Sequence, residues 1–424
     1  MTNIRSRMTT WLGRRYLANI RKKGFDLSSA ALLPESTLMP LRRTGLDPVA
    51  DLGELRDREP VSKLSVPFPM NVWLVSGYEE TKAVLGRTKG FSNDFTNLIG
   101  SSAVTEGQQH PGGLGFSDPP VHTRLRRLLT PEFTMRRLAR LTPRIHEIVE
   151  ERLDEMARTP GPVDLVQSFA LPIPSLVICE LLGVPYEDRE DFQRLGTTRF
   201  DLFAGADASF GVISESLSYL RDIVKKQREN PGDGLLGMLI KQHGDAIDDE
   251  ELTGLADGVL TGGLETTASM LALGTLVLLQ NPDHFATLRD DEAAVSPFVE
   301  ELLRYLTVVQ VAFPRFARED MEIAGTAISA GDVVLCSLSG AGRDASLGPD
   351  MDAFDPTRPS PHVAFGHGIH RCIGAELARM ELCAAYPALL RRFPAMSLAV
   401  PEEELAFRKY SAVFGVDSLP VHLG

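Results

Sequence analysis

The residues best suited to chemistry lie in one short run near the end of the chain, 365–374 (FGHGIHRCIG). Two glycines, Gly366 and Gly368, release the backbone for a tight turn. Cys372 then falls just ahead of a helix-like stretch, 375–382. A cysteine at a helix N-terminus faces unpaired backbone N–H groups and the positive end of the helix dipole, and both favour the thiolate. The run therefore predicts a nucleophile, a redox centre or a metal ligand.

A second constellation, residues 260–267 (LTGGLETT), interrupts a long apolar helical pattern at 249–279. Glycines weaken a helix there. Thr266, four residues after Gly262, can bond back to that carbonyl and open the helix, which makes room for a small molecule and water. Glu265 beside it can relay protons. The alternative is a close helix–helix crossing made possible by small residues.

Two further patterns place charged side chains on one helix face. Glu301 and Arg304 are three residues apart and can form an ion pair, and His122 and Arg126 are four apart. On a surface such groups contribute little. Beside a buried anion, however, Arg and His supply charge-assisted partners.

These residues need a scaffold, and the 424-residue chain, 43% hydrophobic and 24% charged, can bury a large core. No linker divides it, so we expect one domain at 45–424 after a basic N-terminal extension at 1–44. The pattern predicts a mostly α protein with small β-sheets (α+β) and not a βαβ alternation. Helices are expected at 131–156, 213–226, 249–279 and 373–393, two more from Asp283 to Arg304 separated near Pro297, and strands at 72–75 and 333–336.

Several classes of protein are disfavoured. Cys179, Cys336 and Cys383 lie in apolar runs and are most simply core residues, and no Cys/His spacing indicates zinc. Gly262-Gly263 has neither Walker nor Rossmann spacing. The net charge of −13 argues against a nucleic-acid partner. No secretory pattern appears and no apolar run reaches membrane-spanning length, so we expect a cytoplasmic protein.

Taken in order along the chain, these motifs resemble those of the cytochrome P450 monooxygenases over roughly residues 45–424. The haem-binding loop of that family, Phe-x-x-Gly-x-His/Arg-x-Cys-x-Gly, is matched by Phe365, Gly368, His370, Cys372 and Gly374. The resemblance implies a soluble bacterial-type member, with a long central helix over haem b and Cys372 as the iron ligand before a proximal helix.

The resemblance also implies roles for the other motifs. Thr266 would hydrogen-bond dioxygen and Glu265 would help to deliver protons, whereas Thr267 would be a neighbouring, non-essential hydroxyl. Glu301 and Arg304 would form a buried scaffold pair, completed by Arg358. Residues that would hold the haem are His122, Arg126, Arg315, Phe365, Gly366, His370 and Gly374.

The expected substrate pocket is apolar and suits a lipophilic molecule such as a fatty acid, a terpenoid or steroid, or a polyketide. Its segments would include the loop at 100–116 and the stretch at 200–203. Single residues expected in it are Leu260, Leu264, Val311, Phe313 and Phe414.

Two basic surfaces stand out against the acidic chain. Residues 1–25 hold seven basic side chains and no acid, with apolar residues near helical spacing, so they would either touch a membrane weakly or form a surface extension. A second group would cluster on the cysteine side of the haem and dock an acidic iron–sulfur ferredoxin. It consists of Arg124, Arg127, Arg136, Arg137, Arg371 and Arg379.

The hypothesis is therefore a monomeric haem-thiolate monooxygenase that receives electrons from a ferredoxin and its reductase and inserts one atom of O2 into a lipophilic substrate. The alternatives are a peroxide-driven peroxygenase, expected to lack the Glu265-Thr266 pair, and a haem protein that senses or carries a ligand without turnover. A helical structural protein would require all the motifs to coincide by chance.

Overall fold

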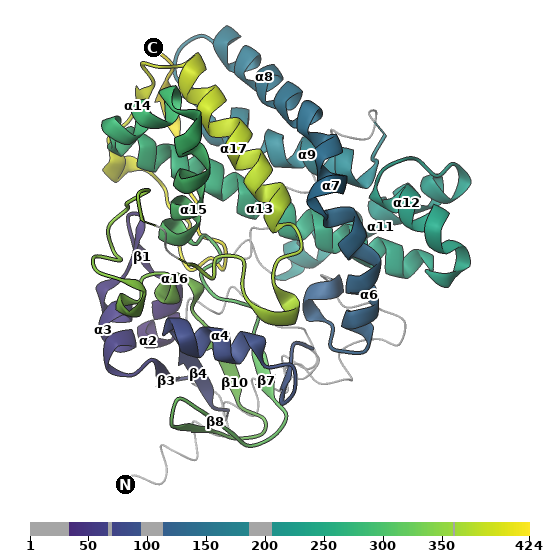
Figure 1. The fold of residues 1–424 in the computed structure, drawn as a ribbon, viewed down its shortest axis with the longest axis vertical. Helices are drawn as coiled ribbons and strands as arrows, with labels where there is room; N and C mark the ends of the chain where they lie inside the picture. Colours follow the sequence, from purple (N-terminus) through teal and green to yellow (C-terminus); the bar gives the residue numbers. More distant parts are fainter. Residues whose placement is uncertain (1–33, 67–69, 95–112, 186–205, 359–360) are drawn as a thin grey trace.

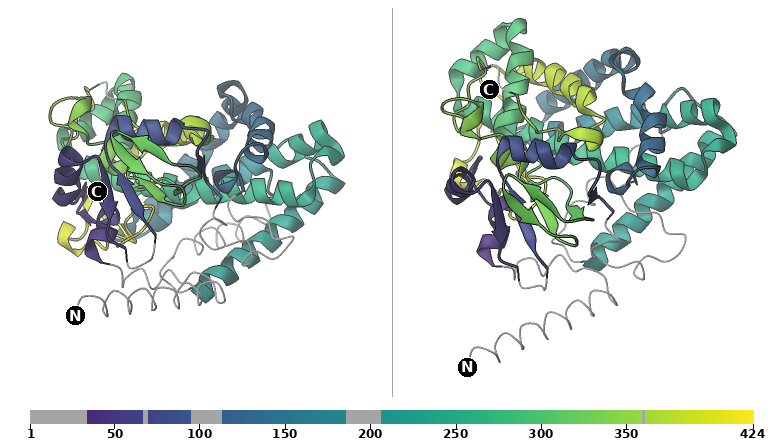
Figure 2. Two further views of the ribbon diagram at one scale, coloured as in Figure 1. Left: turned by 90° about the horizontal axis from the view of Figure 1, so that it is seen from below. Right: turned by 60° about the horizontal axis from the view of Figure 1, so that its bottom comes forward.

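The computed structural model describes residues 34–66, 70–94, 113–185, 206–358 and 361–424 (Figure 1). The predicted basic helix at 1–25 and the pocket segments at 100–112 and 200–203 lie outside these residues. Most of the helices pack together in one part of the molecule. The largest sheet lies on the side opposite α11 (Ala206–Glu229) and α12 (Leu235–His243) (Figure 2). The architecture is mostly α with small sheets, as the sequence predicted.

The longer helices are α3 (Ala50–Arg58), α4 (Tyr78–Gly86), α6 (Val121–Leu129), α8 (Thr142–Arg158), α9 (Pro172–Leu182), α11 (Ala206–Glu229), α12 (Leu235–His243), α13 (Asp249–Gln280), α14 (Pro282–Asp290), α15 (Val295–Leu306) and α17 (Ala375–Arg392). Shorter turns are α2 (Glu35–Leu38), η2 (Met39–Leu41), η4 (Gly113–Phe116), η5 (Thr130–Phe133), α7 (Met135–Leu138), η6 (Ala139–Leu141), η7 (Val166–Ala170), η9 (Gly244–Ala246), η10 (Glu292–Ala294), α16 (Leu338–Ala341), η11 (Ala345–Leu347), η12 (Gly368–His370) and η13 (Glu402–Glu404).

Within the described residues the largest sheet has the strand order β3-β4-β10-β7-β5. Its strands are β3 (Val61–Leu64), β4 (Val72–Val75), β5 (Phe91–Ser92), β7 (Arg315–Ala317) and β10 (Val333–Cys336). The smaller sheets contain β1 (Arg43–Thr44), β2 (Asp47–Pro48), β6 (Val163–Asp164), β8 (Met321–Ile323), β9 (Thr326–Ile328), β11 (Ser397–Leu398) and β12 (Pro420–His422). The two predicted strands, β4 and β10, are confirmed with the same bounds and pair in parallel, with Val333 opposite Val72.

Helix α13 crosses the centre of the molecule and confirms the predicted helix at 249–279. It begins at a capping box, in which Asp248 accepts a hydrogen bond from the Glu251 N–H at 2.7 Å and Glu251 reaches back to the Asp248 N–H. By length and composition α13 could cross a membrane, contrary to the sequence expectation, but most of its apolar stretch is buried inside the fold. It is therefore the core helix on which the other elements pack.

Helix α17 packs against α13, and the two cross in Figure 1. Tyr386 of α17 is fully buried, and its hydroxyl donates a 2.5 Å hydrogen bond to the Met270 carbonyl. Gly274 makes this approach feasible, because a Cβ there would lie 2.0 Å from the Tyr386 hydroxyl oxygen. The crossing fixes the start of α17, and hence Cys372, relative to the middle of α13.

Two helix predictions were wrong in detail. The predicted helix at 131–156 is broken into η5, α7, η6 and α8, and both η5 and α8 have proline in their first turn, where a helix can start but not continue inward. The break between α14 and α15 lies at η10 and not at Pro297, because Asp291 caps η10 by accepting from the Ala293 N–H. Pro297 sits in the first turn of α15.

The packed part of the chain also starts earlier than residue 45. Leu38 and Met39 are buried. Arg43 donates to the Gln310 side chain at 2.9 Å and to the Leu306 carbonyl at 2.8 Å. Residues assigned from sequence to the N-terminal extension therefore pack on the loop that follows α15.

Arg304 and Glu301 form a fully buried, bidentate ion pair on α15, with both N–O distances at 2.7 Å. The Arg304 guanidinium also donates to three backbone carbonyls, those of Gly342, Met351 and Ala353. Each N–H group of the Arg304 guanidinium thus has an acceptor, as a buried charge requires.

Arg358, predicted as the third member of this pair, bonds to neither Glu301 nor Arg304 in the part of the chain that the structure describes, but it adjoins them through Asp355, whose carboxylate lies 3.8 Å from its guanidinium. Its guanidinium contacts the Asp350 carbonyl and the Met351 sulfur. The Asp355 N–H, two residues after Ala353, donates to Glu301 Oε1 at 2.9 Å. The segment before the cysteine loop is therefore held mainly by its backbone groups.

We predict that Arg304→Met lowers the free energy of unfolding by about 3–5 kcal/mol, because Glu301 is left buried without its cation. Chemical denaturation measures the loss. Arg152→Met, which breaks an exposed pair with Glu155 at the same three-residue spacing, is the control and should cost less than about 1 kcal/mol. Equal losses in the two variants would contradict a structural role for the buried pair.

Candidate active site

Cys372 lies in a tight turn between η12 and α17. Gly366 and Gly368 have φ angles of +68° and +71°, a region that favours glycine. The Cys372 N–H donates to the Phe365 carbonyl at 2.9 Å, which closes the turn. The Arg379 guanidinium lies over the Phe365 ring, 4.8 Å from its centroid.

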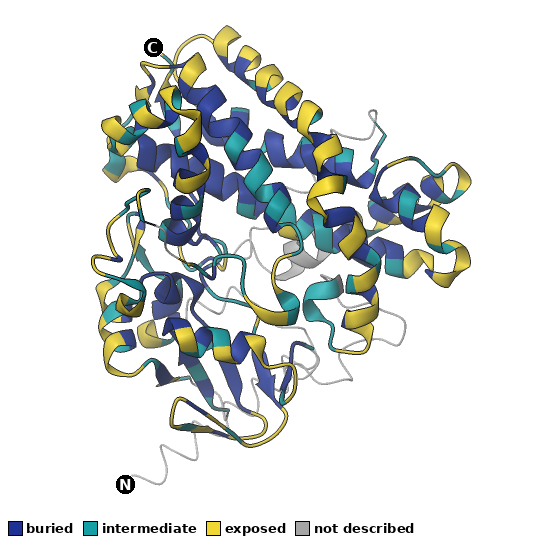
Figure 3. Cartoon of the chain, viewed as in Figure 1, coloured by how far each residue is buried: buried dark blue, intermediate teal, exposed yellow. Residues whose placement is uncertain are grey.

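The Cys372 side chain is accessible to solvent, yet so much protein surrounds it that burial raises the pKa of its thiol. The Gly374 N–H and the arginines at 126, 371 and 379 act in the opposite direction. A sulfur that lines a recess, instead of the outer surface, is both reached by solvent and surrounded by protein. Figure 3 shows this loop in intermediate and exposed colours.

A stripe of α13 is likewise open although the helix is otherwise buried. Gly258, Gly262 and Thr266 follow one another at four-residue spacing and are partly or fully exposed. A Cβ on Gly262 would meet nothing within 4 Å, whereas one on Gly263 would lie 2.9 Å from Ile178 of α9. Gly263 thus allows a close helix crossing, and Gly262 opens onto free space.

Thr266 makes the predicted bond. Its hydroxyl donates to the Gly262 carbonyl at 2.8 Å, while α13 remains continuous. The hydroxyl oxygen therefore stays at the open stripe and can still accept a hydrogen bond there. Its neighbour Thr267 is buried.

Four basic side chains gather beside the cysteine loop: His122 and Arg126 of α6, Arg315 of β7, and His370 of η12. The rings of His122 and His370 lie 4.1 Å apart. Burial, His122, Arg315 and Arg126 together lower the pKa of His370 to about 3, and burial lowers the pKa of Arg315 and of Arg126. These four predicted residues are brought together.

Among the described residues the carboxylate that acts on this cluster is Asp118, which opposes the lowering of the pKa of His122 and of Arg315. His122 is buried, and neither of its ring nitrogens has a partner with hydrogen-bonding geometry, although the Ile369 backbone lies close. Arg315 donates only to the Phe313 carbonyl among the bonds recorded in the described residues. Buried donors of this kind need a hydrogen-bond acceptor. The carboxylates of a haem would satisfy them, and the Cys372 sulfur would supply an iron ligand.

Glu265 is buried and forms an ion pair that the sequence did not reveal. The Arg408 guanidinium donates to Glu265 Oε1 at 2.5 Å. Burial raises the pKa of Glu265 to about 8, and Arg408 opposes that rise. Arg408 lies in a polar segment with no motif, 143 residues away along the chain, so no sequence signal could have found it.

The predicted pocket residues separate into two groups. Leu260, Leu264 and Phe414 are buried at 1% exposure in the core, and Phe414 stacks on Phe407. Val311 is half-buried and Phe313 is 49% exposed. The exposed stripe of α13 therefore runs along Gly258, Gly262 and Thr266 and not along the predicted Leu260 and Leu264.

Phe116, at the described end of the predicted 100–116 loop, joins the accessible apolar group. Its ring centroid lies 4.5 Å from that of Phe313. Gly115 permits this pairing, since a Cβ there would lie 2.9 Å from the Phe313 ring. The turn that carries Phe116, η4, packs on α13.

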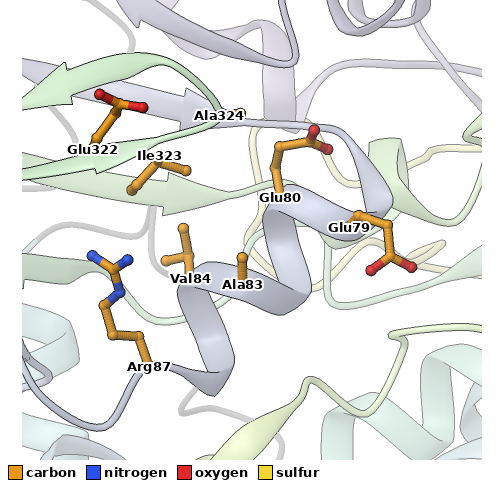
Figure 4. Close-up of a pocket in the computed structure, with 8 residues that line it drawn as sticks. All are labelled: Glu79, Glu80, Ala83, Val84, Arg87, Glu322, Ile323 and Ala324. Atoms are coloured by element: carbon orange, nitrogen blue, oxygen red, sulfur yellow. The ribbon is translucent and has the colours of Figure 1, made fainter.

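A separate pocket of about 320 Å³ lies between α4 and the β8–β9 hairpin (Figure 4). Glu79, Glu80 and Glu322 line it together with apolar side chains. None of the residues predicted to act in chemistry lines it, so it is not a second part of the site described above.

The chain is similar in sequence to proteins of one known family. A family model described as cytochrome P450 matches residues 65–227 and 201–409. Cytochrome P450 165B3 of Amycolatopsis orientalis is 39% identical over 90% of this chain and 97% of that protein. The mycinamicin IV hydroxylase/epoxidase of Micromonospora griseorubida is 38% identical over 89% of this chain and 96% of its own.

Solved structures agree. OxyE, a cytochrome P450 involved in teicoplanin biosynthesis, has a TM-score of 0.83 and 39% identity, and the match covers 91% of this chain and 99% of that one. StaH, a P450 from the biosynthesis of a glycopeptide antibiotic, has a TM-score of 0.81 and 41% identity over 91% of this chain.

We predict that Gly368→Ala destabilises the fold by about 1–3 kcal/mol more than Gly366→Ala. Both put alanine at positive φ, but only the Cβ on Gly368 collides with backbone, 2.3 Å from the Leu85 carbonyl oxygen. Gly366 has nothing within 4 Å and is the matched control. Thermal and chemical unfolding measure the difference, and equal stabilities would show that the loop is not seated against α4.

Proposed function

The chain belongs to the cytochrome P450 family and is a monooxygenase of that class, and from this premise we propose that it inserts one oxygen atom from O2 into a lipophilic small molecule. The observation that carries the proposal is the accessible Cys372 thiol, with two buried bases (His122 and Arg315) and two half-buried ones (Arg126 and His370) beside it and an open stripe on α13.

Haem b is the proposed form of the haem iron cofactor, and when bound it supplies the iron on which dioxygen is activated. Cys372 would be the thiolate ligand. Phe365, Gly366 and Gly374 would shape the loop around the sulfur. His122, Arg126, Arg315 and His370 would bind the carboxylates, which accounts for the unpartnered nitrogens of His122.

Protons for the reaction would be delivered by side chains of α13. The Thr266 hydroxyl, anchored on the Gly262 carbonyl, offers an oxygen at the open stripe. Burial raises the pKa of Glu265, adjacent in sequence, to about 8, so that its carboxyl can carry a proton to be donated at physiological pH. This acid–alcohol pair argues against the peroxide-driven alternative and against a ligand carrier, neither of which needs a proton relay.

Electrons would come from an iron–sulfur ferredoxin and its reductase. Of the six arginines expected on the docking face, three are neutralised within the protein: Arg124 by Glu251, Arg137 by Glu132 and Arg379 by Glu300. The other three have no ion pair recorded in the described residues, and Val121 and Met135 are exposed at 53% and 54%. We define the docking face as Arg127, Arg136, Arg371, Val121 and Met135.

The accessible described wall of the pocket is apolar, with Val311, Phe313 and Phe116. It suits a fatty acid, a terpenoid or steroid, or a polyketide, acted on in the cytoplasm by a monomeric enzyme. Two related proteins, a mycinamicin IV hydroxylase/epoxidase and a P450 from glycopeptide antibiotic biosynthesis, support adding mycinamicin-like compounds and glycopeptide antibiotic precursors to the candidates. The test is a titration of the ferric protein with such compounds, in which a saturable Soret shift identifies the class. A panel without any shift would count against a lipophilic substrate.

We predict that Thr266→Ala retains haem and substrate binding but diverts electrons to peroxide, so that product per electron pair falls at least about tenfold, within the range of a lost proton-transfer group. Thr267→Ala removes a buried hydroxyl next to it and should leave coupling unchanged. The measurement compares electron donor consumed, peroxide and product. Unchanged coupling in Thr266→Ala would remove the proposed role.

We also predict that Arg127→Gln and Arg136→Gln raise the Kd for a ferredoxin several-fold each and flatten its dependence on ionic strength, since each removes one unpaired cation. Arg144→Gln serves as the control, because Arg144 is already neutralised by Glu147, Glu151 and Glu180. Titration at several salt concentrations measures the effect. An identical loss for the control would place the docking face elsewhere.

A further inference from the structure

A carboxylate on α15 reaches across to the helix that follows the cysteine, where Glu300 pairs with Arg379. We propose that this pair sets how readily the iron held by Cys372 accepts an electron: Arg379 is a positioning residue that holds a positive charge near the sulfur, and Glu300 offsets that charge. The inference rests on the proposed function and adds to it the residues that determine the reduction potential.

The two side chains form a bidentate pair with further partners. Arg379 Nε lies 2.5 Å from Glu300 Oε1, and its Nη2 lies 2.9 Å from Oε2. Its Nη1 donates to Glu376, one turn earlier on α17, at 2.9 Å. His362 Nε2 lies 3.1 Å from Glu300 Oε2, while its Nδ1 accepts from the Ala364 N–H at 3.2 Å. Groups from two helices and from the chain before the cysteine loop therefore fix the guanidinium in place.

From this position the guanidinium contacts the cysteine loop. It lies over the Phe365 ring, and the Phe365 carbonyl accepts the hydrogen bond from the Cys372 N–H. The side chains of Arg379 and Glu300 are 23% and 37% exposed, so that water screens their charges only in part. The pair therefore adjoins the loop of the expected iron ligand at a depth where its charges still act.

The Cys372 sulfur is influenced by three cations that differ in their surroundings. Burial raises the pKa of its thiol, and the three arginines oppose that rise: Arg126, Arg371 and Arg379. Arg126 is one of the residues proposed to bind a haem carboxylate, which would offset its charge. Arg371 is exposed, so solvent screens it. Arg379 is half-buried and is offset by this chain's own Glu300, which therefore determines how much of its charge acts on the sulfur.

Both charges of the pair persist at physiological pH. Burial favours the neutral acid, but hydrogen bonds from Arg379 and His362 prevail and lower the pKa of Glu300 to about 2. The hydrogen bond to Glu300 in turn raises the pKa of the Arg379 guanidinium. The two residues thus form a constant pair of opposite charges.

Reduction changes the charge of the site by one unit. One electron that arrives from the ferredoxin makes the site more negative, so a nearby cation favours the reduced form and a nearby anion disfavours it. Arg379 and Glu300 lie near the same sulfur with opposite sign. Removal of the carboxylate should therefore make the site easier to reduce, and removal of the guanidinium should make it harder.

The experiment measures the reduction potential of the haem-loaded protein by spectroelectrochemistry with small redox mediators, so that docking of a ferredoxin plays no part. Glu300→Gln should shift the reduction equilibrium at least about threefold toward the reduced form, or roughly 28 mV at ~59 mV per tenfold change. Arg379→Gln should shift it by a similar factor toward the oxidised form. The double variant should lie near the unmodified protein, as should Arg379→Lys, which retains the charge.

Arg392→Gln is the matched control. Arg392 lies at the other end of α17 and forms an exposed pair with Asp154, so its loss should leave the potential unchanged. A pair that merely clamps the loop would move both single variants in the same direction. Shifts of equal sign, no shift, or an equal shift in the control would overturn the proposal.

The Glu300→Gln protein decides alone if Arg379→Gln does not retain haem: a raised potential supports the proposal, and an unchanged or lowered one overturns it. Failure of the unmodified protein to bind haem, or a spectrum with carbon monoxide that lacks the thiolate-type band, would instead contradict the proposed function. The two failures are therefore distinguishable.

Discussion

The crossing of α17 over α13 is the constraint on which the site depends. A buried tyrosine hydroxyl, that of Tyr386, bonds to a carbonyl of α13 at Met270, and Gly274 leaves no side chain in its way. Hydrogen bonds to buried carbonyls are costly to leave unmade, so the two helices cannot slide without losing this contact. One helix begins at Ala375, three residues after Cys372, and the other carries Thr266, and their crossing therefore sets how Cys372 and Thr266 lie relative to each other.

The charges around the cysteine loop and α13 are segregated. Bases gather on the cysteine side, where His122 and Arg315 are buried without a recorded hydrogen bond to a carboxylate in the described residues. The acid, Glu265, lies on the α13 side and is balanced from outside by Arg408. Such a separation suits an anionic, flat cofactor with a proton source on its other face, because each buried charge then has a partner of opposite sign.

Local patterns in the sequence predicted a large part of this arrangement. The glycine turn around Cys372, the α13 helix and the strand pair β4–β10 depend on neighbouring residues, and the sequence predicted them with nearly correct bounds. Residues whose roles depend on distant contacts were not predictable. Arg408 meets Glu265 only because the C-terminal segment folds back onto α13.

Burial was also hard to read from the sequence. Phe414 was expected in the pocket, but its ring is enclosed between Phe407 and the Arg43 guanidinium. Leu260 and Leu264 are on α13 as expected, yet they face the core. A helix of apolar residues on every side does not reveal which stripe remains open, since that depends on the neighbours it acquires.

The account depends centrally on Cys372 as the thiolate that holds haem iron within this recess. The most direct measurement is the spectrum of the reduced, haem-loaded protein with carbon monoxide, compared with that of Cys372→His. We predict a thiolate-type Soret band for the unmodified protein and an imidazole-type band, or loss of haem, for the variant. The same spectrum from both proteins, or no bound haem in the unmodified one, would contradict the account.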